Sequence, residues 1–183
     1  DLHDELTLEQ AMLFAAKMRL PADLSDIERV EHINGLLELL EIEHRRDTRI
    51  GKLSGGQRKR VSIGIELLSQ PGVLFVDEPT QGLDPRNQER MMYLFRRIAS
   101  QGCTVVMATH QLGGFDLLDR SMVMVAGKLV YYGPVNQFYD YFDVNVPGDI
   151  YARLESEHTA EEWETRFEDT DVFDRYVDSP SLT

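Results

Sequence analysis

Leu53-Ser54-Gly55-Gly56-Gln57 is the stretch that decides the fold. It predicts the start of a helix, because Ser54 is a good N-cap residue and apolar residues follow it at helical spacing. The two glycines remove Cβ atoms where a ligand would approach the backbone, and the first turn of a helix leaves N–H groups without acceptors. Together with the helix dipole, they predict an anion-binding site. Taken alone, Ser54 to Gly56 would favour a simple turn and helix cap.

The run Val73 to Val76, followed by Asp77 and Glu78, predicts a buried strand that ends in two carboxylates. Four apolar residues without alternation indicate a strand covered on both faces, as in a parallel sheet. Open α/β sheets bind ligands at the carboxyl ends of their strands. There Asp77 can hold Mg²⁺ while Glu78 orients or deprotonates a water, although a merely polar strand end is the simpler alternative.

A tight loop from Pro79 to Asp84 leads into the next predicted helix. Asp84 is a good N-cap and Pro85 a good first helical residue, so we expect a helix to about Ser100. Its buried stripe is predicted to be Met91, Leu94, Phe95 and Ile98. A further strand, Cys103 to Ala108, ends at Thr109-His110. A lone histidine in such a place is by itself more often structural than catalytic.

In order and spacing, these segments resemble the motifs of ATP-binding-cassette (ABC) ATPases. Leu53 to Gln57 resembles the signature motif, and Val73 to Glu78 resembles the Walker B strand with its catalytic glutamate. Gly82-Leu83-Asp84 resembles the D-loop, and His110 the switch histidine. The resemblance covers about residues 1–142 and implies an α/β fold, a partial P-loop NTPase-type sheet with flanking helices plus an α-helical subdomain.

The resemblance also implies a site shared between two cassettes. Two nucleotide-binding domains meet head to tail, and each ATP lies between the P-loop of one and the signature helix of the other. Hydrolysis then drives a membrane domain, of the same or a partner chain, from the cytoplasmic face of a membrane. The implied roles are catalytic for Glu78 and His110, Mg²⁺-binding for Asp77, and nucleotide-binding for Leu53, Ser54, Gly55, Gly56, Gln57 and Asp84. The family usually has a small residue where this chain has Gln81.

The phosphate-binding P-loop string Gly-x-x-x-x-Gly-Lys-Ser/Thr does not occur in the sequence. By analogy the glutamine loop would lie just before Asp1, so the chain resembles the second half of a cassette, and we expect it to be inactive alone. Arg58 to Gly64 and Gly127 to Pro134 resemble the G (White) subfamily and its bacterial relatives, as does Leu2 to Thr7. A chain that begins with Asp1 and shows no signal peptide is expected to be cut from something longer.

Residues 1–52 read as two helices of the helical subdomain. Thr7 with Gln10 and Ser25 with Glu28 form capping-box patterns. The first apolar stripe is predicted to be Leu8, Ala11, Met12, Ala15 and Met18, and the second to be Val30, Ile33, Leu37 and Leu40, widened by Leu36 and Ile42. His3, His32 and His44 lack metal-ligand spacing and are predicted to be ordinary surface or packing residues.

Residues 53–142 form the predicted core half, which holds the signature helix, Walker B strand, D-loop and switch histidine. A hairpin with its turn at Gly127-Lys128 and a helix from Val135 to Phe142 close it. Residues 143–183 are predicted to be an acidic helical extension with Trp163 and Phe167 on one helix. That extension either packs on the cassette or links it to a membrane domain.

Composition narrows the functional classes. The 183 residues carry a formal net charge of −13, and residues 143–183 supply −9 of it through twelve acids against three arginines. This balance gives no support to nucleic-acid binding, and Arg58-Lys59-Arg60 is predicted to be one solvated helix face. The single Cys103 is predicted to be buried and excludes a disulfide framework. The alternatives are an ABC-type ATPase of DNA repair or translation, or a non-catalytic interaction module.

Overall fold

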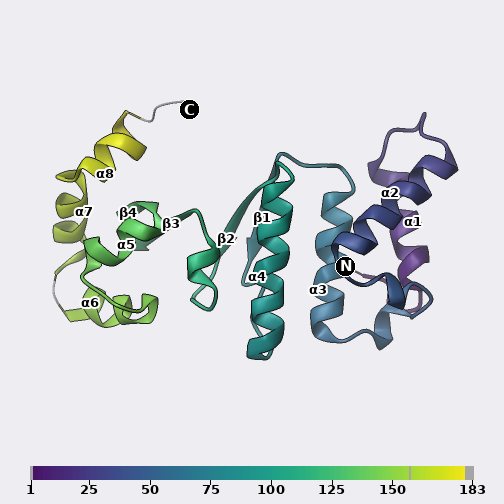
Figure 1. The fold of residues 1–183 in the computed structure, drawn as a ribbon, viewed down its shortest axis with the longest axis horizontal. Coiled ribbons are helices and arrows are strands. Elements are labelled where there is room, and N and C mark those ends of the chain that lie inside the picture. The colour runs from purple at the N-terminus through teal and green to yellow at the C-terminus, as the bar shows by residue number, and fades with distance from the viewer. Residues whose placement is uncertain (1, 157, 180–183) are drawn as a thin grey trace. The chain divides into compact units, whose positions relative to one another are not determined.

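The computed structural model describes residues 2–156 and 158–179. The chain divides into two compact units, Asp1–Gly113 and Gly114–Thr183, whose elements are labelled in Figure 1. Within the described ranges no helix is both long enough and apolar enough to cross a membrane.

Three helices of the first unit share one kind of N-terminus. They are α1 (Leu8–Arg19), α2 (Asp26–Leu39) and α3 (Gly55–Leu67). In each, the hydroxyl of the N-cap residue accepts a hydrogen bond from the backbone N–H of the residue three positions later. The side chain of that later residue accepts a hydrogen bond from the N–H of the N-cap residue. These capping boxes pair Thr7 with Gln10, Ser25 with Glu28 and Ser54 with Gln57. The two capping boxes predicted before α1 and α2 are therefore confirmed, as is the helix start at Ser54.

The helices α1, α2 and α3 pack against one another, and two 3₁₀ turns, η1 (Glu43–Arg45) and η2 (Ile50–Lys52), connect α2 to α3. Gly64 lies where α3 meets the end of α2. A Cβ at this position would lie 2.5 Å from Cδ1 of Leu40, a fully buried side chain. A larger residue here would force the buried Leu40 side chain to shift, so glycine favours this close approach.

The predicted stripes of α1 and α2 are right at their centres and wrong at their ends. Leu8, Ala11 and Met12 are buried in α1, and Ile33, Leu37 and Leu40 are buried at α2. Met18, however, is 74% exposed, Val30 is 37% exposed, and Ala16 rather than Ala15 completes the buried stripe of α1. Helical spacing indicates which residues share a face, but not how far along the helix the covering elements extend.

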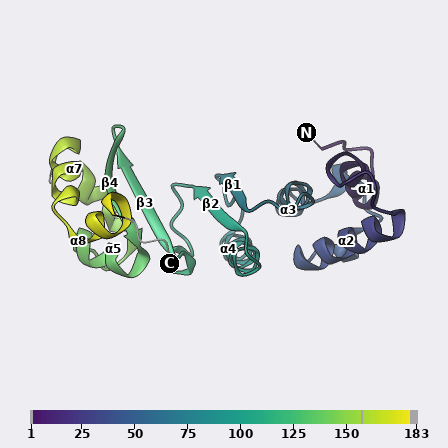
Figure 2. The same cartoon turned by 90° about the horizontal axis from the view of Figure 1, so that it is seen from above.

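The strands β1 (Val73–Asp77) and β2 (Thr104–Ala108) form a two-stranded parallel sheet in which Asp77 pairs with Ala108. The connection between them contains α4 (Pro85–Ser100), which lies along one face of the sheet in Figure 2. The predicted stripe of Met91, Leu94, Phe95 and Ile98 is buried. The predicted positions of both strands and of the helix between them are confirmed.

The prediction that β1 is covered on both faces is wrong. Leu74 is only 5% exposed, but Val73 is 47% and Phe75 76% exposed, and Val106 on β2 is 43% exposed. Successive side chains of a strand point to opposite faces. The exposed residues therefore form the face of the sheet opposite to that of Leu74.

The second unit is built on an antiparallel hairpin of β3 (Arg120–Val125) and β4 (Lys128–Pro134), as predicted. It also contains α5 (Val135–Phe142), α6 (Ile150–Ser156), α7 (Ala160–Glu168) and α8 (Asp171–Phe173), with short turns η3 (Phe115–Leu117), η4 (Pro147–Asp149) and η5 (Asp174–Asp178). α5, α7 and α8 pack on β4 (Figure 2). Their contact buries an aromatic cluster of Tyr131, Phe138, Phe142, Trp163 and Phe167.

Candidate functional site

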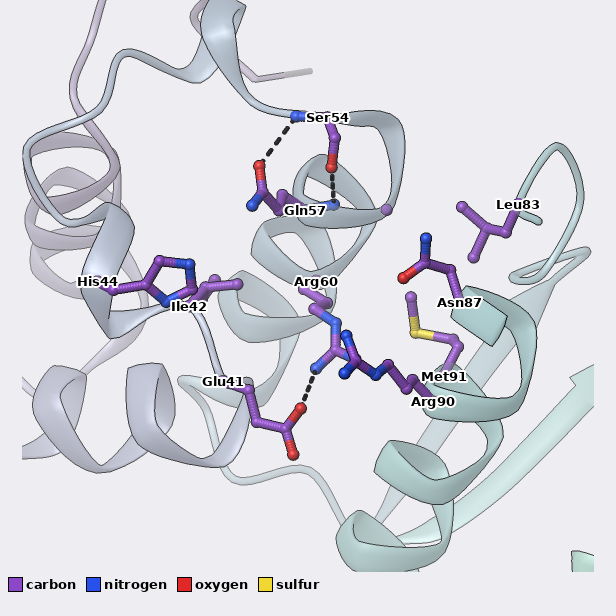
Figure 3. A pocket seen from close by; sticks show the side chains of 11 residues that line it. Glu41, Ile42, His44, Ser54, Gln57, Arg60, Leu83, Asn87, Arg90 and Met91 are labelled. Atoms are coloured by element: carbon purple, nitrogen blue, oxygen red, sulfur yellow. Dashed lines mark hydrogen bonds and ion pairs between the residues drawn. The ribbon is translucent and has the colours of Figure 1, made fainter. Parts of the chain in front are cut away.

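The first part of the site is the start of α3. Oγ of Ser54 accepts a hydrogen bond from the Gln57 N–H at 3.3 Å, and Oε1 of Gln57 accepts one from the Ser54 N–H at 3.0 Å. Both contacts appear as dashed lines in Figure 3. A Cβ on Gly55 would meet no atom within 4 Å, so the space before its backbone is open. The first helical turn thus presents N–H groups toward open space, which suits an anion.

The D-loop residue Leu83 lies beside this helix start. A Cβ on Gly56 would come within 3.4 Å of Cδ2 of Leu83. Both residues line a cavity of about 180 Å³, which also contains side chains from residues 41–44 and from the first turns of α4. Figure 3 shows Arg60 and Arg90 approaching one another across it. The structure therefore brings the segments that resemble the signature motif and the D-loop together within one chain.

Leu53, which precedes the helix, is buried, with 6% of its surface exposed. Its carbonyl oxygen accepts a hydrogen bond from Nε of Arg58 at 3.4 Å. Its side chain therefore anchors the motif in the core, and only its backbone faces the site. The nucleotide-binding role expected for Leu53 remains a prediction, and the burial of its side chain restricts that role to the main chain.

The prediction that Arg58, Lys59 and Arg60 form one solvated face is wrong. Arg60 is only 9% exposed and donates to the Leu40 carbonyl at 2.6 Å, while Arg58 donates to the Gly51 carbonyl at 2.8 Å. Burial lowers the pKa of Arg60, which the nearby carboxylate of Glu41 opposes. Consecutive residues are about 100° apart around a helix, so three in a row cannot share a face.

The second part of the site lies at the carboxyl end of β1. Oε1 of Glu78 is 2.6 Å from Nδ1 of His110 and accepts the His110 N–H at 3.0 Å, and Oε2 accepts the Thr109 hydroxyl at 3.1 Å. The backbone of Glu78 is in the left-handed region, with φ of 42°. Few non-glycine residues adopt this strained conformation, although Glu41, Gln70, Ala126 and Asp143 do so in this chain too.

These hydrogen bonds set the charge of Glu78. The bond from the His110 side chain lowers the pKa of the Glu78 carboxyl, and those from the His110 N–H and the Thr109 hydroxyl lower it further, while partial burial opposes them. Glu78 is therefore ionised at neutral pH. Since an ionised carboxylate only accepts hydrogen bonds, Nδ1 of His110 carries the hydrogen in this contact.

Asp77 and Asp84 lie on either side of Glu78 in the sequence. Asp77 is exposed at the end of β1, next to Glu78. Among residues 2–156 and 158–179, no group of three or more His, Cys, Asp or Glu side chains could hold a metal ion. A single exposed carboxylate still fits Mg²⁺, which keeps several waters and is held by one or two carboxylates together with phosphates.

Asp84 caps α4. Its Oδ1 accepts the Asn87 N–H at 3.1 Å, and this contact, followed by one from the Asn87 side chain, lowers the pKa of Asp84. The structural role predicted for Asp84 is thus confirmed. A role across an interface between two cassettes remains a prediction.

Sequence reasoning missed three polar residues of the site. Thr109 binds Glu78, Thr80 donates to Oε1 of Gln111 at 3.1 Å, and Lys59 reaches the loop after β1. Thr109 could have been found, because it directly follows a strand next to the candidate histidine. Lys59 could not, because it lies on another element and its partners are main-chain carbonyls.

Comparisons with known proteins identify relatives of this chain. The family model described as "AAA domain, putative AbiEii toxin, Type IV TA system" matches residues 3–113, more than half of the chain. The ABC transporter ATP-binding/permease protein Rv1747 of Mycobacterium tuberculosis is 38% identical over 154 residues, 84% of this chain and 18% of its own length. The mouse broad substrate specificity ATP-binding cassette transporter ABCG2 is 38% identical over 144 residues, 75% of this chain and 22% of its own. The chain thus spans about a fifth of these relatives.

Solved structures show the same fold. CbiO1 of Clostridium perfringens, part of the ABC transporter complex cbiONQ, matches with a TM-score of 0.69 and 30% identity, covering 76% of this chain and 55% of its own. The dimeric bacterial ABC transporter cassette MJ0796 matches with a TM-score of 0.62 and 26% identity. The match covers 74% of this chain and 59% of MJ0796. The chain belongs to the family of ABC transporter ATP-binding domains, is homologous to the G family and to Rv1747, and corresponds to the C-terminal part of full nucleotide-binding domains.

Proposed function

We propose that this chain is the signature and Walker B half of a cassette that binds ATP with Mg²⁺ and hydrolyses it between two copies arranged head to tail. The observation that carries the proposal is the cluster of Glu78, Thr109 and His110 at the carboxyl end of the β1–β2 sheet. The helix start at Ser54 supplies the second half of such a site. The dimeric cassette among the structural relatives supports the arrangement.

Glu78 orients the attacking water. An ionised carboxylate has about four acceptor positions, and three are used by the His110 imidazole, the His110 N–H and the Thr109 hydroxyl. The remaining position can accept a hydrogen from a water. Because its pKa is lowered, Glu78 is a weak base while His110 binds it. When His110 contacts the γ-phosphate instead, Glu78 loses the hydrogen bond that lowers its pKa most. Glu78 then becomes a stronger base.

Ser54, Gly55 and Gly56 bind the γ-phosphate of an ATP held mainly by the partner cassette. The open space before Gly55 and the N–H groups of the first helical turn support this role. Gln57 keeps the Ser54 backbone in the cap geometry through its side-chain oxygen. The backbone of Leu53 and the D-loop residue Asp84 complete the nucleotide contacts that the family implies.

Mg²⁺, when bound with ATP, neutralises charge on the phosphate oxygens. Asp77 would hold this ion from its exposed position beside Glu78 in the sequence. Asp77 thus serves the ion and Glu78 the attacking water. Hydrolysis removes the phosphate that joins the two cassettes, so they separate and drive a membrane domain at the cytoplasmic face of a membrane. An ATP-binding/permease protein among the relatives supports this coupling.

The isolated chain of 183 residues is expected to bind ATP weakly and not to hydrolyse it, because its sequence contains no P-loop. Calorimetry with ATP and Mg²⁺ measures this directly. Micromolar affinity in the isolated chain would refute the assignment of the main ATP contacts to a P-loop segment, and would favour a different nucleotide site.

The head-to-tail arrangement is tested in a full-length cassette that carries these residues. With Glu78→Gln, which keeps the shape of the side chain but slows hydrolysis, ATP should convert monomers to dimers in sedimentation experiments. Ser54→Asp in the same background should abolish that conversion, because its charge opposes the γ-phosphate. An ATP-dependent dimer that survives Ser54→Asp would refute the role of the α3 start and favour a non-catalytic interaction module.

A further inference from the structure

We propose that Lys59 is a positioning residue for Glu78 and links it to the signature helix within one chain. Nζ of Lys59 donates hydrogen bonds to the carbonyl oxygens of Glu78 at 3.2 Å, Pro79 at 3.0 Å and Gln81 at 2.7 Å. This inference rests on the proposed catalytic role of Glu78. It adds a residue whose side-chain donors go to main-chain carbonyls and that acts through the main chain.

The chemistry of Lys59 matches the loop. An ammonium group has three N–H donors and no acceptor, and here each donor has one carbonyl partner. In the part of the chain that the structure describes, all hydrogen bonds of the Lys59 side chain go to main-chain oxygens. Lys59 is only partly exposed, so its charge is not simply solvated. Hydrogen bonds from a charged donor are stronger than neutral ones.

The loop needs such a group because its backbone is unfavourable. Glu78 has φ of 42° and Gly82 has φ of 75°, so the chain turns sharply between β1 and α4. A left-handed non-glycine residue is strained and persists only when its surroundings hold it. The turn also points three carbonyl dipoles at one place, where they repel one another unless a cation lies between them.

Other contacts hold this loop to β2 and to the segment after it, and within the loop the N–H groups of Gln81 and Leu83 donate to the Glu78 and Thr80 carbonyls. The Glu78 N–H donates to the Ala108 carbonyl at 2.8 Å, and buried Thr80 donates to Gln111. Both tie the loop to β2 and the segment after it. Lys59 alone among these contacts ties it to α3, five residues after Ser54. In a head-to-tail pair, Ser54 serves one ATP and Glu78 the other, so a shift of α3 on binding one nucleotide reaches Glu78 through Lys59.

The test is ATP hydrolysis by the full-length cassette with Lys59→Met, which keeps the length of the side chain and removes the donors. Displacement of a catalytic group by about 1 Å can cost about 10²-fold, so we expect kcat to fall by one to two orders of magnitude with KM for ATP unchanged. Lys59→Arg should recover part of the loss, because it restores a cation. The matched control is Lys17→Met, an exposed lysine on α1, which should leave kcat and KM unchanged.

A double variant separates positioning from a general structural role. If Lys59 acts through Glu78, Lys59→Met in the Glu78→Gln background should cause no further loss of single-turnover hydrolysis. An additional loss of similar size would overturn the proposal. A folded Lys59→Met variant with kcat within twofold of wild type would also overturn the proposal. If Lys59→Met unfolds, Lys59→Gln replaces it in the same test.

Failure of this inference and failure of the proposed function give different results. If Glu78→Gln abolishes turnover while Lys59→Met does not affect it, the role of Lys59 is wrong and that of Glu78 stands. If Glu78→Gln leaves turnover intact, the proposed function itself is wrong.

Discussion

Oε1 of Glu78 lies 2.6 Å from Nδ1 of His110 and also accepts the His110 backbone N–H. One residue thus holds the same carboxylate oxygen through both its side chain and its main chain. Because β1 and β2 are parallel and Asp77 pairs with Ala108, both residues emerge at the same edge of the sheet. The contact is therefore a direct consequence of the strand register.

This contact makes a prediction about pH. The folded-state pKa of Glu78 lies below its unfolded value, so it contributes stability that is complete above the unfolded pKa of about 4.3 and is lost as pH falls through the folded pKa. His110→Ala removes the largest cause of the shift. The free energy of unfolding of the variant should then approach that of wild type as pH is lowered through this window.

Urea unfolding of the chain between pH 3 and 6 measures this difference. His3→Ala, at an exposed histidine near the N-terminus, is the matched control and should not change the slope of stability with pH. Equal slopes for wild type and His110→Ala would contradict the contact between His110 and Glu78.

Gly64 is predicted to be irreplaceable for packing rather than for catalysis. Gly64→Ala places a Cβ 2.5 Å from buried Leu40, and overpacking of this kind costs about 1–3 kcal/mol. Gly35→Ala, on α2, is the control because a Cβ there meets nothing within 4 Å. It should stabilise the chain by roughly 0.5–1 kcal/mol through helix propensity. Denaturant unfolding of wild type and both variants measures these differences. Equal stabilities of Gly64→Ala and Gly35→Ala would contradict the α2–α3 packing.

Ser54 is predicted to have two separable roles. Ser54→Ala loses the helix cap and should cost about 1 kcal/mol of unfolding free energy, whereas Ser62→Ala, in the exposed middle of α3, should cost little. Ser54→Asp keeps a good N-cap, so the chain should stay as stable as wild type. In the full-length cassette, however, its negative charge should abolish ATP turnover. Turnover of Ser54→Asp at the wild-type rate would show that Ser54 is only a cap.

The sequence predicted what local rules determine. The capping boxes of α1 and α2 and the Asp84-Pro85 start of α4 depend on a few neighbouring residues, and all are confirmed. The hairpin is confirmed too, but its turn is Ala126-Gly127, one residue earlier than predicted, because Lys128 pairs with Val125. The pairing of Glu78 with His110 could have been predicted, because parallel strands place their carboxyl ends at the same edge of a sheet.

The rest depends on tertiary contacts that a single sequence does not contain. Phe75 and Met18 are exposed because no described element covers them, although their spacing is that of core residues. Arg60 is buried because the Leu40 carbonyl at the end of α2 needs a donor. Lys59 gains its partners only when α3 packs beside the loop after β1. The charge of Arg60 and Lys59 favoured exposure of both side chains to solvent. Long-range packing instead buries Arg60 and gives Lys59 main-chain partners.

The central claim is that Glu78 directs water at a bound ATP, and single-turnover hydrolysis by the full-length cassette tests it most directly. The measurement compares Glu78→Gln with Glu89→Gln, which removes an exposed carboxylate on α4. We predict that Glu78→Gln retains ATP binding and hydrolyses the bound ATP at least 10²-fold more slowly than wild type, while Glu89→Gln hydrolyses it at the wild-type rate. Hydrolysis by Glu78→Gln at the rate of wild type would contradict the account.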